Sequence, residues 1–176
     1  MKLLSHQLLN ELATRAAGTP RKRANHNIHS GAEDPVQRFF VAAQRETYFR
    51  PHRHVTRSEM AYIVRGRFRV LTFADDGEVT GRFEVGEGTS SVGFETPAGT
   101  WHTLLSELDG SIFLEIKQGP YDPQISAEFA SWAPPEEDPR KAAFLAWLRT
   151  AQPGSRAVAT EGGYVTRLPR SEAAAG

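Results

Sequence analysis

Short apolar runs separated by turn residues fill the middle of the chain, from about residue 36 to residue 118. The runs are strand-sized, and no helical periodicity interrupts them. We expect strands over residues 36–43, 47–50, 60–64, 68–73, 79–85, 91–95, 102–107 and 112–117. Asp75-Asp76-Gly77 and Asp109-Gly110 supply turns of the kind that join hairpins. The pattern predicts a mainly β fold, an antiparallel sandwich, jelly roll or barrel.

A helical pattern appears on each side of this region. Leucines and alanines recur at helical spacing over 6–17, after Ser5 as the N-cap, and a turn-rich loop follows over 19–35. A second helix is expected from the cap Asp138 to Pro153-Gly154, with Pro139 at its first position.

These patterns divide the chain into four parts. Residues 1–35 hold a helix and loop that pack on the barrel, and residues 36–122 form the barrel itself. A segment with the second helix follows over 123–152, and a tail over 153–176. The tail is either flexible or, through its apolar residues, an extended strand.

Composition narrows the function classes. The chain has 176 residues with 21 basic and 21 acidic side chains, so no overall field favours nucleic acid or a membrane surface. There are no cysteines, which excludes disulfides, thiolate metal ligands and cysteine nucleophiles. No apolar stretch reaches the roughly 20 residues that a membrane-spanning helix needs, and we expect a cytoplasmic protein.

Two histidines and a glutamate are spaced for metal binding. His52 and His54 are two residues apart, so on a strand they point to the same side. A short turn then brings Glu59 onto the neighbouring strand, and a Pro-x-Gly turn aims His102 at the start of another. Imidazole and carboxylate ligands suit a divalent transition metal: Fe, Mn, Co, Ni, Cu or Zn. We predict one such ion at His52, His54, Glu59 and His102.

The same residues resemble the two motifs of the cupin superfamily. His52-x-His54, Glu59 and Gly66 match the first motif, and Pro97-x-Gly99-x-x-His102 matches the second. Two positions depart from it, since Glu46 stands where a glycine is usual and Ser106 where an asparagine is usual. The resemblance implies a jelly-roll barrel, also called a double-stranded β-helix, with one metal.

Further segments resemble the WbuC-type cupin metalloproteins, which are associated with bacterial surface-polysaccharide genes. They are Arg23-Ala-Asn25-His26-Asn27-x-His29, Asp34-Pro-Val-Gln-Arg38, Arg50-Pro-His-Arg-His54, Gly99-Thr-Trp-His102 and Lys117-Gln-Gly-Pro-Tyr-Asp122. The likeness covers roughly residues 1–150. It implies a sugar-related ligand but gives no reaction.

Residues near the predicted metal are candidates for ligand binding. Strand parity places Tyr48 and Arg50 on the side of His52, and Arg50 there either reads an anion or pairs with an acid at the barrel rim. Lys117 shares a strand face with Glu115, and the alternation favours solvent over a polar pocket for that face.

A second polar cluster precedes the barrel. Asn25, His26, Asn27 and His29 either fold over the barrel opening and contact the ligand or serve as turn caps and surface histidines.

Two classes of function follow. The first is a metalloenzyme acting on a small polar metabolite, such as a sugar or nucleotide sugar, by isomerisation or epimerisation, or else by oxidation. The second is a non-catalytic module that binds or senses a small molecule through the metal. With three neutral imidazoles and one carboxylate, the metal unit carries one net positive charge, so an anionic or polyhydroxylated ligand is expected. Unprotected strand edges also suggest a homodimer.

Overall fold

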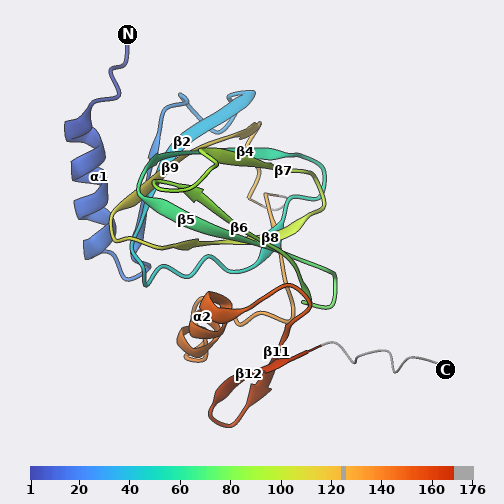
Figure 1. Ribbon diagram of the computed structural model, residues 1–176. Helices are drawn as coiled ribbons and strands as arrows, with labels where there is room; N and C mark the ends of the chain where they lie inside the picture. The colour runs from blue at the N-terminus through green and yellow to red at the C-terminus, as the bar shows by residue number, and fades with distance from the viewer. Residues whose placement is uncertain (124–125, 169–176) are drawn as a thin grey trace, which may run out of the picture.

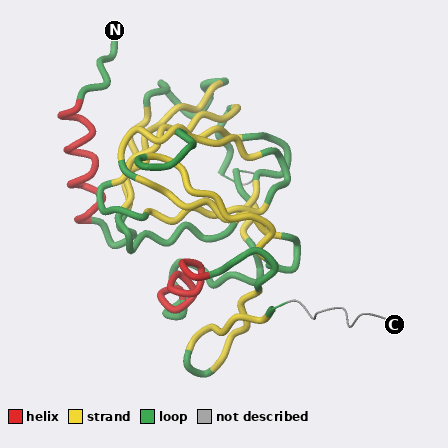
Figure 2. Tube along the Cα trace, viewed as in Figure 1, coloured by secondary structure: helices red, strands yellow, loops and turns green. Residues whose placement is uncertain are grey.

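In the computed structural model, which describes residues 1–123 and 126–168, two antiparallel sheets face each other as a barrel. Figure 1 shows the long strands wrapped around a common interior, and Figure 2 shows both helices outside them. Among the described residues, no helix is both long enough and apolar enough to cross a membrane.

Each sheet has five strands. The first has the order β1-β2-β9-β4-β7, with β1 Arg23–Asn27, β2 Val36–Ala43, β9 Ser111–Gln118, β4 Glu59–Arg65 and β7 Gly93–Thr96. The second has the order β10-β3-β8-β5-β6, with β10 Glu128–Phe129, β3 His52–Arg53, β8 Trp101–Ser106, β5 Arg67–Phe73 and β6 Val79–Gly86. Outside the barrel lie the helices α1 His6–Gly18 and α2 Lys141–Thr150, and a hairpin of β11 Arg156–Thr160 and β12 Gly163–Arg167.

Apolar side chains fill one end of the barrel interior. Phe68 and Phe113 meet edge to face across the two sheets, with ring centroids 5.3 Å apart, and both are buried. Val41, Ile63, Val70 and Leu104 complete this core. The predicted mainly β jelly roll is confirmed, because inward positions at one end of the barrel alternate with outward ones as the sequence pattern requires.

The outer faces of both sheets are also covered. Leu9, Leu12 and Ala16 of α1 pack on Phe40 and Ile112 of the first sheet. On the second sheet, α2 and the segment before it cover Leu71, Phe73 and Trp101. Burial of both faces explains why many strands read as continuous apolar runs.

Four local details differ from the sequence expectation. β1 lies in the segment expected to be loop and extends the first sheet by pairing Arg23–Asn27 with Phe39–Ala43. Residues 47–50 have no strand partner. α2 begins at Lys141, because the carboxylate of Asp138 accepts from the main-chain N–H of Arg140 in a preceding turn. The described part of the tail forms the β11–β12 hairpin, and residues 169–176 lie outside the described residues.

Gly66, the glycine of the first cupin-like motif, joins β4 to β5 with a φ of 73°. A Cβ there would lie 2.3 Å from the Oγ and 2.9 Å from the Cβ of Ser111. We expect Gly66→Ala to lower the free energy of unfolding by about 2–4 kcal/mol, measured by urea titration.

Gly88 is the matched control for this substitution. It has a similar φ of 74°, but a Cβ there meets nothing within 4 Å. We therefore expect Gly88→Ala to lower the free energy of unfolding by the backbone strain alone, about 1 kcal/mol. Equal losses in the two variants would contradict a role for the contact with Ser111.

Candidate metal centre

Three short elements bring the four predicted ligands together. His52 on β3 pairs in register with His102 on β8, and Glu59 begins β4 in the other sheet. His54 follows β3, on the same side of the chain as His52. One ligand atom from each of the four side chains lies within 4.8 Å of the other three.

Main-chain carbonyl groups orient all three imidazoles. Nδ1 of His52 lies 3.0 Å from the oxygen of Arg50, and Nδ1 of His102 lies 2.9 Å from the oxygen of Thr100. Nδ1 of His54 makes the same kind of bond with the oxygen of Ser126. Because a carbonyl oxygen only accepts, each Nδ1 carries the proton and donates it. Each Nε2 is then left with a lone pair that faces the centre of the site, as in metal-binding histidines.

These lone pairs meet a carboxylate. The two oxygens of Glu59 lie 2.7 Å from Nε2 of His102 and 2.8 Å from Nε2 of His54. Nε2 of His54 is buried and has no hydrogen-bond donor or acceptor in suitable geometry among the described residues. Nitrogen lone pairs and a carboxylate at this separation repel one another unless a positive charge lies among them. The donor set therefore suits a divalent metal ion.

The pKa values of the candidate ligands also indicate that the site favours a positive charge. Burial, the largest effect, lowers the pKa of His52 to about 3, so this imidazole is neutral. Burial would also lower the pKa of His102, but its hydrogen bond with Glu59 outweighs burial and raises it. Burial would raise the pKa of Glu59, yet the imidazoles of His102 and His54 beside its two oxygens hold it well below its usual range. Glu59 is therefore a carboxylate at neutral pH.

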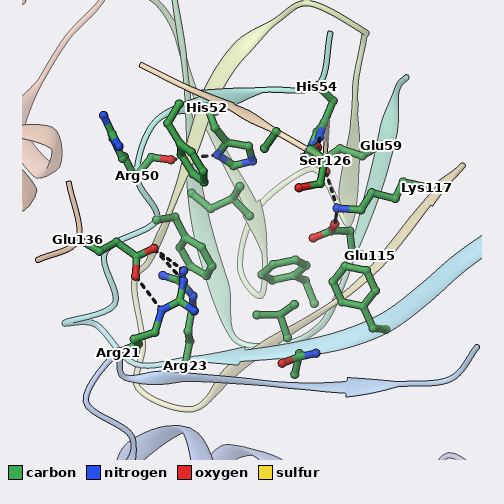
Figure 3. Close-up of a pocket in the computed structure, with 18 of the residues that line it drawn as sticks. Arg21, Arg23, Arg50, His52, His54, Glu59, Glu115, Lys117, Ser126 and Glu136 are labelled. Atoms are coloured by element: carbon green, nitrogen blue, oxygen red, sulfur yellow. Dashed lines mark hydrogen bonds and ion pairs between the residues drawn. The ribbon is translucent and has the colours of Figure 1, made fainter. Parts of the chain in front are cut away.

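His52, His54 and Glu59 line a cavity of about 300 Å³, called the metal cavity below, and His102 is fully buried behind its wall. Figure 3 shows His52 and His54 on one side of this cavity, with Glu115 and Lys117 beyond Glu59. Nζ of Lys117 lies 2.6 Å from Glu115 and 3.9 Å from Glu59. Burial, the largest effect, and the charge of Glu59 raise the pKa of Glu115 to about 7, against the opposing effect of Lys117.

The position of Glu115 and Lys117 corrects a sequence expectation. Alternation favoured solvent for this face of β9, but both side chains point into the barrel and are largely buried. The opposite face carries Ile112 and Leu114, which pack beneath α1. The inference from alternation was wrong because the helix covers the outside of the sheet and the barrel opening is polar.

Strand parity placed Arg50 and Tyr48 beside the metal ligands, but only Arg50 lines the metal cavity, and the two residues share the wall of a neighbouring chamber. Arg50 lines the metal cavity, and its guanidinium donates to the oxygen of Ala130, 2.8 Å away. The ring of Tyr48 is buried in the core between the barrel and α2, where its hydroxyl donates to the oxygen of Pro134. Residues 47–50 are not a regular strand, so the alternation of sides does not extend back to Tyr48.

The residues of the polar cluster before the barrel lie on β1 or directly after it, and they do not share one site. Asn25 lines the metal cavity, and Asn25, Asn27 and His29 line a neighbouring cavity of about 420 Å³. His29 is buried, with Nδ1 bonded to the main chain of Arg38. His26 is on β1 but does not line either cavity.

Sequence reasoning missed an ionic cluster in the same cavity. Arg21 and Arg23 both pair with Glu136, at 2.7 Å and 2.6 Å, and the three lie together at one end of the pocket in Figure 3. Glu136 is more than a hundred residues from both arginines along the chain, and no local sequence pattern predicts such an ion pair. The basic run Arg21-Lys22-Arg23 is the local signal that could have pointed to this cluster.

Comparison with known proteins supports the fold. A family model described as a domain of unknown function, DUF6016, matches residues 4–85. A search of curated proteins finds no match to the sequence. The structure is similar to CapF with the inhibitor 3-isopropenyl-tropolone, at 17% identity and a TM-score of 0.51 over 64% of this chain and 32% of CapF.

Two other solved structures are similar at lower scores. Oxalate oxidase with the substrate analogue glycolate has 16% identity and a TM-score of 0.49 over 64% of this chain and 57% of the oxidase. The Schizosaccharomyces pombe Cnp3 cupin domain has 10% identity and a TM-score of 0.45 over 55% of this chain and 64% of that domain. The chain has a jelly-roll barrel fold, and its cluster of three histidines and a glutamate suits a metal ion.

Proposed function

We propose that this chain is a metalloenzyme that holds one divalent transition metal at His52, His54, Glu59 and His102. The observation that supports the proposal is the convergence of the four ligand atoms, which lie within 4.8 Å of one another beside a cavity of about 300 Å³ lined by three of the four residues. The ligand set is compatible with Fe, Mn, Co, Ni, Cu or Zn. The motifs around it also support membership of the WbuC-type cupins, and with it a ligand related to bacterial surface polysaccharides.

We infer a small, polar, anionic or polyhydroxylated substrate. When bound, the metal would supply Lewis-acid or oxygen-activating chemistry at substrate oxygens. Glu115 and Lys117 lie beside Glu59 and provide the acid–base pair that the sequence alone did not reveal. Isomerisation or epimerisation is the first reaction class, because Glu115 can take a proton from a carbon next to a carbonyl group and return it. Oxidation is the second.

Solvent exchange tests this proposal. Metal-loaded protein is incubated in D₂O with a panel of sugars and sugar phosphates, and the loss of carbon-bound hydrogen is followed by NMR. We expect exchange in at least one compound, and a rate roughly 100-fold lower in Glu115→Gln, which keeps the side-chain volume but cannot take the proton. Glu95→Gln, at an exposed position on β7, is the control and should exchange at the normal rate.

The rival function is a non-catalytic binding module. Compounds that bind the protein loaded with each of the six metals, with neither exchange nor oxygen consumption, would favour that module and contradict the enzyme. Equal exchange rates in Glu115→Gln and the normal protein would instead remove Glu115 from the mechanism.

A further inference from the structure

A second chamber, with a volume of about 530 Å³, lies beside the metal cavity. It shares Arg21, Arg50, Phe129 and Glu136 with the metal cavity, so these four side chains belong to the walls of both spaces. The chamber is also lined by Lys141.

Two arginines in this region already have a carboxylate partner. Arg21 and Arg23 share Glu136, and each guanidinium lies less than 3 Å from it. Arg50 makes no ion pair within the described parts of the chain. Its Nε is buried and has no hydrogen-bond partner there. A guanidinium held in a pocket without a carboxylate leaves a positive charge for a ligand to neutralise.

The surroundings of Arg50 hold it in place without neutralising it. One terminal nitrogen donates to the oxygen of Ala130, and the guanidinium lies 5.3 Å from the ring centroid of Phe129. The main-chain oxygen of Arg50 also orients His52, a predicted metal ligand. The backbone of Arg50 is thus fixed at the metal site. Of the five N–H groups of its guanidinium, one donates to Ala130, and three others on the terminal nitrogens stay available to a ligand.

Acidic residues of the chamber do not offset this charge. Glu136 is occupied by two arginines, and Glu46 is 77% exposed and lies 4.0 Å from Lys22. Glu137 is exposed to solvent, where water screens its charge. Arg50 and Lys141 are the partly buried cations of this chamber that have no carboxylate partner among the described residues, and Lys141 donates to the main-chain oxygen of Glu136. Of the two, Arg50 also lines the metal cavity.

The cavity on the other side of the metal site is different. Its polar lining includes the amide groups of Asn25, Asn27 and Gln37. Its one cation, Lys117, is neutralised by Glu115 at 2.6 Å. Amide groups of this kind suit hydroxyl groups better than a second charge. The two sides of the metal site therefore favour different parts of a ligand.

We propose that Arg50 forms an anion-binding subsite beside the metal, and that the ligand carries a phosphate or carboxylate group there while its hydroxyl-bearing part faces the metal. This inference deepens the proposed function and rests on it for the second contact, but the anion contact itself needs no metal. It also fixes the orientation of the ligand, with the charged end toward Phe129 and the uncharged end toward Asn25 and Asn27.

Glycerol 3-phosphate and glycerol are suitable probes, because they differ only in the charged group. Their dissociation constants are measured by calorimetry with the full chain, in metal-loaded and metal-free form, and metal content is determined on the same samples. We expect the phosphate to bind roughly ten-fold or more tightly than glycerol. In Arg50→Gln this preference should disappear, and in Arg50→Lys, which keeps the charge, part of it should remain.

Arg65→Gln is the matched control, since Arg65 contacts Asn10 on the other side of the first sheet and should keep the full preference. Raising the salt from about 0.02 M to about 0.5 M should weaken the preference in the normal protein, which tests the charge without any substitution. A normal protein with no preference for the phosphate, or a preference that persists in Arg50→Gln, overturns the subsite.

Metal content separates this inference from the proposed function. If the protein binds metal but shows no preference for the phosphate, the subsite is contradicted and the metal site is not. A preference that depends on Arg50 in protein that binds no metal would support the subsite and count against the metalloenzyme.

Discussion

Glu59→Gln should purify with less than about a tenth of an equivalent of transition metal, where the normal protein carries about one. Glutamine has nearly the same shape, but its amide has no negative charge. It would leave three neutral imidazoles without the carboxylate that lies 2.7 Å from His102 and 2.8 Å from His54. A buried dication with only neutral ligands is poorly stabilised, so we expect the metal affinity to fall at least 100-fold.

Elemental analysis of protein purified without added metal measures this effect, and titration with Co²⁺ gives the affinity. Glu95→Gln removes an exposed carboxylate on β7, the strand that pairs with β4, and should keep the full metal content. Because metal binding stabilises only the folded chain, a chelator should lower the melting temperature of the normal protein and of Glu95→Gln, but not of Glu59→Gln. Equal metal content in the two variants would contradict the predicted ligand set.

Phe144→Ala should lower the free energy of unfolding by about 3–5 kcal/mol. Phe144 on α2 is fully buried in the core between the second sheet and the C-terminal segment. Its ring lies 5.5 Å from that of Trp147 and 5.0 Å from that of Tyr164, centroid to centroid. Truncation would leave a cavity among large rigid rings that cannot close around it.

Denaturant unfolding followed by tryptophan fluorescence measures this loss. Phe83→Ala is the control, because Phe83 on β6 is 55% exposed and its removal should change stability by less than about 0.5 kcal/mol. Glu136 lies in the segment before α2, so loosening this core should also disturb the end of the pocket where Arg21 and Arg23 lie. A small change in Phe144→Ala would mean that α2 adds little to the stability of the barrel.

The strands of the barrel could be predicted because their signals are local. The start of β2 at Val36 and its end at Ala43 follow directly from the apolar run and the turn residues around it. β1 was missed since its residues are neither apolar nor alternating, and it is a strand only because the edge of β2 offers partners for its backbone. The segment over 47–50 was wrongly expected to be a strand because its apolar pattern lacks a partner strand.

Residue spacing also determined the candidate metal ligands. His52 and His54 share a side because successive strand residues alternate, and the turn before Glu59 is short enough to return the chain to the site. His102 could be added because a Pro-x-Gly turn before a strand fixes its direction. The four candidate ligands and the jelly-roll fold could thus be predicted from the order of residues along the chain.

Only the tertiary structure decided what surrounds those ligands. Whether a face of β9 meets water or the barrel interior depends on what covers the other face, and α1 covers it, which turns Glu115 and Lys117 inward. Among the described residues Arg50 has no carboxylate partner, while Glu136 is bound by Arg21 and Arg23. Strand parity and turn chemistry act over a few residues, so the sequence determined the candidate metal ligands and most of the barrel strands. Pairing of charges acts between groups that only the folded chain brings together, so the chemistry of the pocket could not be read without it.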